Sequence, residues 1–280
     1  MNKIGSQLKL SWRIFTDKFF SVKTFTLWIL LGVIYHIFLS PIKNFSAFVD
    51  YPVSPWIFPF LISDVYFVIL FMAAVVYFFS DVPFMKEWTL YQVIRTGRAR
   101  WALGQIGSII LNSFVFVLLA EVVSGTLLLP DIILNEGWGK VLYTLSITNA
   151  AGEYQIPFLI SYDIISMFEP VQAVGLSVFI SSLVIAFIGL WMFMVSLYVS
   201  RLWANVTAML FVILPIVIEN IGEDVTWLVY CSPVTWMRIS EINVSSIPGI
   251  IAVLLFACAI LSIAIIWKIT KVDFELTKEN

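Results

Sequence analysis

The most regular pattern along the chain is a series of long apolar runs, separated by short stretches where charged residues gather. A helix needs roughly 20 apolar residues to cross a bilayer. Six runs meet or approach that length, at about 24–40, 56–79, 104–129, 171–199, 203–218 and 247–267. Because the runs are continuously apolar rather than alternating, they favour helices over the strands of a closed barrel. The sequence therefore predicts an all-α polytopic membrane protein with six transmembrane helices.

Composition and charge distribution add an orientation to this prediction. The chain of 280 residues is 61% hydrophobic and only 12% charged, whereas about a quarter of the residues in a soluble domain are charged. Most Lys and Arg residues lie before the first run, between the second and third, between the fourth and fifth, or after the sixth. An excess of basic residues marks the cytoplasmic side. We therefore expect a multi-pass protein of the plasma or inner membrane with both termini in the cytoplasm.

Residues 1–23 carry an amphipathic helical pattern. The apolar positions recur at spacings of three and four residues: Ile4, Leu8, Trp12, Phe15 and Phe19. Basic residues lie off this stripe, so the pattern predicts a helix lying in the inner membrane interface. Packing against a soluble partner is the alternative interpretation.

Residues 81–103 carry aromatic and basic residues between two apolar runs, and as a helix this segment has two faces. One face is Leu90, Ile94, Gly97 and Trp101, and it suits packing on the membrane-embedded part of the chain. The other face is Trp88, Tyr91, Arg95 and Arg98, and it suits a cytoplasmic partner. Guanidinium groups pair with carboxylates and stack on aromatic rings. The alternative is a solvated loop whose arginines only follow the positive-inside rule.

Two segments on the other side of the membrane are unusual. Residues 130–170 contain several acids and turn residues, and they are too long for a simple connection, so we expect an external segment that forms a small cap. Residues 219–246 contain a short apolar stretch that ends at Ser232-Pro233. Proline disfavours a helix in the residue before it, and the pattern predicts short re-entrant helices before the last span.

Motifs for nucleotide binding and hydrolysis are absent from the sequence. There is no G-x-x-x-x-G-K-[ST] loop, no H-E-x-x-H and no G-x-S-x-G. The single histidine, His36, forms no histidine pair, and Cys231 and Cys258 have no metal or redox spacing. We therefore expect no catalytic residue, no metal site and no cofactor on this chain.

Three features together resemble the type-2 ABC exporter permease family. The stretch "DVPFMKEWTLYQVIRTGRARWALGQ" at 81–105 resembles the family's cytoplasmic coupling helix, and the amphipathic N-terminus resembles its connecting helix. "YCSPVTW" at 230–236 resembles the Ser-Pro-x-x-Trp pattern of its outer re-entrant element. The 130–170 segment departs from the family, which usually joins its third and fourth spans briefly.

The resemblance implies that residues 1–280 form one permease domain, the membrane subunit of an ATP-driven exporter of a peptide, antibiotic or lipid-like amphiphile. It implies two separate ABC ATPase subunits that hold ATP and Mg²⁺, a second copy or a related permease, surrounding lipid, and no nucleic acid. The ATPase-coupling interface would then be Trp88, Tyr91, Arg95 and Arg98.

Four ionisable residues lie inside or at the ends of the apolar runs: His36, Asp64, Glu121 and Glu219. Charges at this depth usually face a cavity or a partner. If these side chains converge, they line a pathway and favour a cationic substrate. The alternative is that each lies at a wet interface or pairs with an internal donor such as Arg238.

Two further functions remain open from the sequence. A membrane-embedded enzyme could use Asp64, Glu121 and His36. An ATPase-independent sensor or immunity protein would need only a binding partner.

Overall fold

The computed structural model describes residues 3–84, 93–94, 96–133, 137–221, 232–241 and 246–271, and within them it is helical, with no strand beyond a single bridge between Val53 and Ile132. The α-helices are α1 (Lys3–Phe19), α2 (Val22–Val49), α3 (Phe58–Ser63), α4 (Val65–Phe79), α6 (Arg98–Thr126), α7 (Gly139–Ile147), α8 (Ala150–Glu153), α9 (Tyr162–Met167), α10 (Pro170–Tyr198), α11 (Arg201–Ile221) and α12 (Ile247–Lys271). Two 3₁₀ turns, η2 (Thr235–Met237) and η3 (Ile239–Glu241), precede α12.

Five helices are long and apolar enough to cross a membrane, namely α2, α6, α10, α11 and α12. The prediction of an all-α protein is therefore confirmed for the described residues, and five of the six predicted spans correspond to helices that are long and apolar enough to cross a membrane. The second predicted span, 56–79, is instead divided into α3 and α4 at Asp64. Asp64 has an extended backbone (ψ 130°), and its Oδ1 accepts a hydrogen bond from the Phe67 amide at 2.8 Å. An aspartate that caps a helix in this way starts a new helix.

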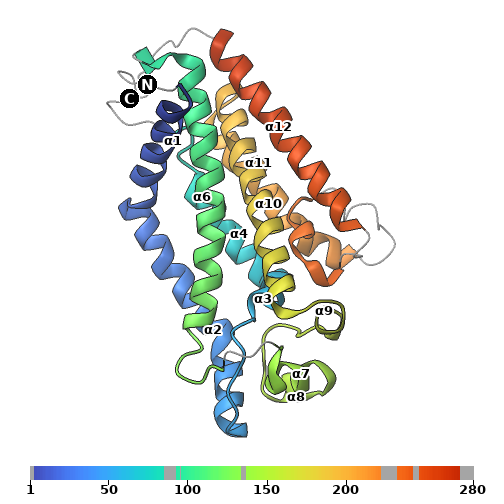
Figure 1. Cartoon of the computed structure of the whole chain (residues 1–280). Coiled ribbons are helices and arrows are strands. Elements are labelled where there is room, and N and C mark those ends of the chain that lie inside the picture. The colour runs from blue at the N-terminus through green and yellow to red at the C-terminus, as the bar shows by residue number, and fades with distance from the viewer. Residues whose placement is uncertain are drawn as a thin grey trace.

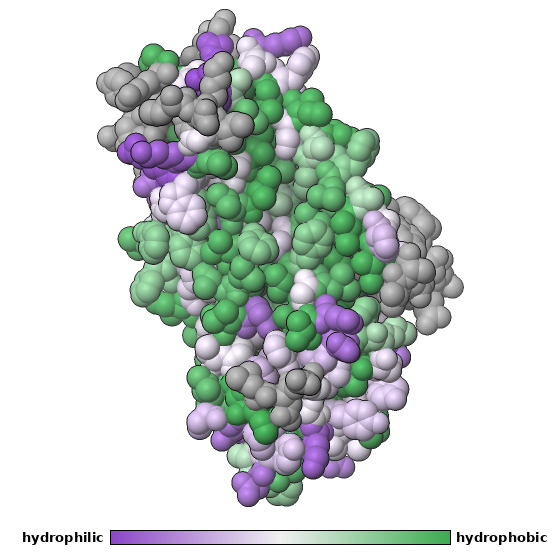
Figure 2. Space-filling model, in the orientation of Figure 1, coloured by the Kyte–Doolittle hydropathy of each residue, from purple (hydrophilic) through white to green (hydrophobic). Residues whose placement is uncertain are grey.

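The helices form an elongated bundle with distinct ends (Figure 1). α1 begins and α12 ends at the same end, whereas α7, α8 and α9 lie at the opposite end. On the visible face, hydrophobic residues form a broad band across the middle, and hydrophilic residues gather toward both ends (Figure 2). This arrangement is typical of a protein surrounded by lipid at mid-height, since an apolar patch of this size is rare on a soluble monomer.

α10 is the central helix of the bundle. Within its most apolar 18-residue window, 72% of residues are buried, compared with 22% in α11 and in α12. Gly189 lies at a close contact of α10 with two other helices, since a Cβ built there would lie 2.7 Å from Ile109 Cγ2 of α6 and 3.3 Å from ring atoms of Phe79 of α4. Small residues allow membrane helices to approach this closely. α10, α6 and α4 therefore form the tightly packed centre of the fold.

α1 packs along α6. Its buried face includes Ser11 and Ile14, which lie against Gly107 and Gly104 of α6. The predicted apolar stripe contributes only in part to the buried face, because Phe15 is 6% exposed but Leu8 and Trp12 are 66% and 58% exposed. The stripe is therefore divided: Phe15 is buried within the fold, whereas Leu8 and Trp12 remain on the outer surface, where contact with the membrane interface stays a prediction.

The two expected segments at the other end are described in part. Residues 130–170 contain α7, α8 and α9, so this segment forms a small helical cap. Of 219–246, the structure describes 219–221, 232–241 and 246. Ser232 donates a hydrogen bond to the Phe211 carbonyl of α11 at 3.0 Å, and Met237 is fully buried. The Ser-Pro segment is thus part of the core rather than an exposed loop.

A charged cluster joins the α1–α2 junction to the end of α4; its members are Lys18, Lys23, Ser80 and Asp81. Lys18 Nζ donates to both carboxylate oxygens of Asp81, at 2.6 and 2.8 Å, and the Lys18 side chain is only 4% exposed. Lys23 Nζ donates to Ser80 Oγ at 2.6 Å and to Asp81 Oδ1 at 3.2 Å. Burial alone would raise the pKa of Asp81, but the two ammonium groups outweigh it and hold that pKa below its ordinary value.

We predict that Asp81→Asn lowers the free energy of unfolding by about 1–2 kcal/mol at neutral pH, because it leaves the buried Lys18 ammonium without its counter-charge. The effect stays below that of a fully buried pair, since the Asp81 side chain is 46% exposed. Because the folded pKa of Asp81 is lowered, its contribution is complete above about pH 5 and is lost as the pH falls below about 4.

Denaturant titration in detergent micelles between pH 3 and 7 measures this effect. The double variant Lys18→Met/Asp81→Asn is the matched control, since removing both charges should restore much of the lost stability. Equal stability of wild type and Asp81→Asn at pH 7 would mean that the cluster does not stabilise the junction.

Candidate functional site

A buried arginine, Arg238, stabilises the break between α3 and α4 in the second apolar run. The carbonyl of Ser63, the last residue of α3, lies at a helix end where backbone acceptors lack partners within the helix. Arg238, which is 7% exposed, donates from Nε to this carbonyl at 2.7 Å. Its Nη2 also lies 2.6 Å from Glu219 Oε1 near the end of α11. Arg238 thus joins α3, α11 and the segment before α12.

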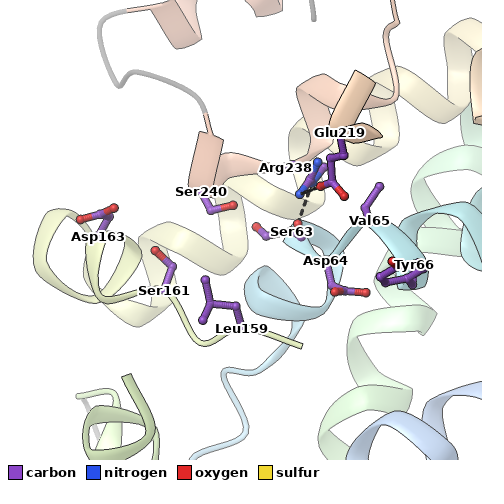
Figure 3. A pocket seen from close by; sticks show the side chains of 10 residues that line it. All are labelled: Ser63, Asp64, Val65, Tyr66, Leu159, Ser161, Asp163, Glu219, Arg238 and Ser240. Atoms are coloured by element: carbon purple, nitrogen blue, oxygen red, sulfur yellow. Dashed lines mark hydrogen bonds and ion pairs between the residues drawn. The ribbon is translucent and has the colours of Figure 1, made fainter. Parts of the chain in front are cut away.

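A pocket of about 310 Å³ lies at this junction (Figure 3). It is lined by Ser63, Asp64, Val65, Tyr66, Leu159, Ser161, Asp163, Glu219, Arg238 and Ser240. These residues come from the α3–α4 break, the segment leading into α9, the end of α11 and the turn at η3. Irregular backbone inside a membrane protein is tolerated where protein covers it or where it lines a water-filled cavity, and this pocket meets that condition.

The charged groups of the pocket have different environments. The guanidinium of Arg238 points toward Glu219 and Ser63, whereas the Asp64 carboxylate is turned toward Tyr66 (Figure 3). Asp163 lies on α9, on the other side of the pocket, and is exposed. The lining therefore contains one ion pair and two further carboxylates.

Of the four ionisable residues proposed to line a pathway, two line this pocket and two lie elsewhere. Asp64 and Glu219 both line the pocket, although they lie 155 positions apart in the sequence. Glu219 also pairs with Arg238, as the alternative interpretation proposed. His36 is exposed on α2, and Glu121 is half-buried on α6; neither lines this pocket. Two of the four residues therefore share this pocket, and His36 and Glu121 lie outside it.

The proposed ATPase-coupling interface lies mostly outside the described residues, which include Arg98 but not Trp88, Tyr91 or Arg95. Arg98 is the first residue of α6, and Gly97 before it has a φ of +85°, a left-handed conformation that glycine adopts without strain. The expected third span thus begins at 98 rather than 104. A single helix running through 97 and 98 is excluded.

The other predicted face of that segment, Leu90, Ile94, Gly97 and Trp101, does not form one packed surface. Trp101 is fully buried in α6, but Ile94 is 82% exposed. The expectation that Ile94 packs on the chain's own membrane-embedded part is therefore wrong. The turn at Gly97 separates the two residues, so their helical spacing in the sequence does not place them on one face.

Sequence reasoning named Asp64 and Glu219 but did not propose the other polar lining residues, among them Ser63, Tyr66 and Asp163, as site residues, and it named Arg238 only as a possible donor. The signal for the break was present, since Ser63-Asp64 is a pair of polar residues with capping propensity inside an apolar run. Among the described residues, no group of three His, Cys, Asp or Glu side chains could hold a metal ion.

Comparison with known proteins finds no match for this chain among family models, curated proteins or solved structures.

Proposed function

We propose that this chain is the transmembrane permease subunit of an ATP-driven ABC transporter that exports an amphiphilic or peptide-like substrate. One observation carries the proposal: an apolar helical bundle contains a broken span whose break opens into a charged pocket. Transporters commonly place substrate contacts at the broken ends of discontinuous helices, where backbone groups and charges can face a ligand. Two ATPase subunits and a second permease complete the proposed assembly.

The charged cluster of Lys18, Lys23, Ser80 and Asp81 supports the proposal from the opposite end of the second span. Asp81 is the first residue of the proposed coupling segment 81–103, and Lys18 and Lys23 attach it to the α1–α2 junction. A force applied to that segment would therefore act on α4 and α1 together. Asp64 is the N-cap of α4 and lines the pocket, so the same helix connects this cluster to the pocket.

The proposal is favoured over a membrane-embedded enzyme by the position of three residues. That alternative needs Asp64, Glu121 and His36 around one substrate, but only Asp64 lines the pocket. General acid–base catalysis requires groups within hydrogen-bonding reach of the same reacting atoms. The pocket instead presents carboxylates beside a paired arginine, an arrangement suited to binding.

Affinity purification from the native membrane tests this function. The chain, solubilised in mild detergent, is expected to retain a stoichiometric ABC ATPase that mass spectrometry identifies. Tyr91→Ala with Arg95→Ala is expected to release that ATPase, because aromatic and arginine side chains dominate many interfaces, at about 2 kcal/mol or more each. Arg201→Ala, an exposed arginine outside the proposed interface, is the control. Purification of an intact chain without any ATPase, or ATP binding by the chain alone, would overturn the proposal.

A further inference from the structure

We infer that the pocket at the α3–α4 break binds a small organic cation, a ligand that carries an ammonium group. The inference rests on the proposed function where it calls this ligand the substrate, because it assigns the substrate class of that same site. The binding itself is a property of this chain and can be measured without a transport assay.

The balance of charge in the pocket favours a cation. Three carboxylates line it against one guanidinium, so the formal charge of the lining is −2. Glu219 and Arg238 pair with each other at 2.6 Å, which leaves Asp64 and Asp163, on opposite sides of the pocket, as the lining carboxylates outside that ion pair (Figure 3). In a site partly shielded from water, such an imbalance attracts a positive ligand more strongly than it would in bulk solvent.

Arg238 does not offer a comparable site for an anion. Its Nε is used by the Ser63 carbonyl and its Nη2 by Glu219, and the residue is 7% exposed. An anionic ligand would have to displace Glu219 and would then meet the Asp64 carboxylate. The buried arginine therefore shapes the pocket without reversing its charge.

An aromatic ring and the pocket's size specify the kind of cation. Tyr66 is 61% exposed, lines the pocket and lies toward the Asp64 carboxylate (Figure 3). An aromatic face beside a carboxylate is a favourable environment for an alkylammonium group. The volume of about 310 Å³ is at the lower end of small-molecule sites, which run from roughly 300 to 1,000 Å³. These features fit a small alkylammonium group better than a bare metal ion.

The test uses radiolabelled tetraethylammonium and the full chain purified in detergent, with binding followed by a scintillation proximity assay at constant ionic strength. Saturable binding is expected in the wild type. Asp64→Asn should weaken it roughly five- to twentyfold. This variant is informative because asparagine caps a helix as well as aspartate does, so α4 keeps its cap while the pocket loses a charge.

Two comparisons separate recognition from folding. Asp131→Asn makes the same chemical change in a residue outside the pocket lining and should bind like wild type. Tyr66→Phe should retain binding, whereas Tyr66→Leu should weaken it, since only the former keeps the aromatic face. Each variant must elute from size exclusion at the wild-type volume to be compared.

The outcomes distinguish this inference from the proposed function. No saturable binding by the wild type, or equal affinity in wild type and Asp64→Asn, overturns the cation site even where an ATPase co-purifies. Cation binding that depends on Asp64 in a chain that retains no ATPase supports the site and overturns the ABC permease proposal.

Discussion

Replacing Arg238 with methionine is expected to lower the free energy of unfolding by about 2–4 kcal/mol. The guanidinium satisfies the carbonyl of Ser63, a residue only 7% exposed, and an unpaired buried acceptor alone costs about 1–3 kcal/mol. Loss of the pairing with Glu219 adds less, because that side chain is 36% exposed and water can solvate it. Denaturant titration in detergent micelles measures the change.

Arg201→Met is the matched control for this prediction. Arg201 is exposed at the first residue of α11, and surface substitutions usually change stability by less than about 0.5 kcal/mol. Glu219→Gln should lie between the two variants, since glutamine keeps an acceptor for Arg238 but not its charge. If Arg238→Met unfolds at the same denaturant concentration as Arg201→Met, then Arg238 does not stabilise the break in the second span.

Gly189→Val is expected to destabilise the bundle by about 3 kcal/mol, the upper end of the range for overpacked cores. The first added carbon alone would lie 2.7 Å from Ile109 Cγ2 and 3.3 Å from the Phe79 ring. Ile109 is fully buried and Phe79 is 1% exposed, so neither side chain can move into solvent. α6 or α4 must therefore shift away from α10, which loses packing along both helices.

Gly175→Val makes the same change in the same helix at a position where a Cβ would meet nothing within 4 Å. Gly175 is exposed, and its replacement should leave the unfolding midpoint nearly unchanged. The contrast between the two valines is read from thermal unfolding of the purified chain. Equal midpoints would contradict the assignment of α10 as the closely packed centre.

The break at Asp64 shows how far local sequence reasoning extends. The polar pair Ser63-Asp64 can cap a helix, but the apolar run around it is long enough for one continuous span. The local pattern is therefore compatible both with one continuous helix and with two helices that meet at Asp64. Arg238 decides between them, because its hydrogen bond to the Ser63 carbonyl, across 175 positions of sequence, satisfies the backbone group that the break exposes.

The glycines of α6 give a second example. The spacing of Leu8 and Trp12 predicted an amphipathic helix at the N-terminus, and α1 is indeed a helix. Which face it buries depends on Gly104 and Gly107, where Leu10, Ile14 and Ser11 approach the α6 backbone. Hydrophobicity cannot select that face in a membrane protein, because lipid solvates apolar side chains as well as another helix does.

The sequence by itself determined the helical class, the approximate positions of the apolar helices and the clustering of basic residues. These properties depend on composition and spacing within about 20 residues, the scale on which the bilayer acts on a helix. Only the tertiary structure decided that Asp64 and Glu219 share a pocket while His36 and Glu121 lie elsewhere, and that Gly97 separates Ile94 from Trp101. Those outcomes depend on close packing at small residues and on polar pairs between distant parts of the chain. Local hydrophobicity does not determine either of these interactions, because the partners are far apart in the sequence.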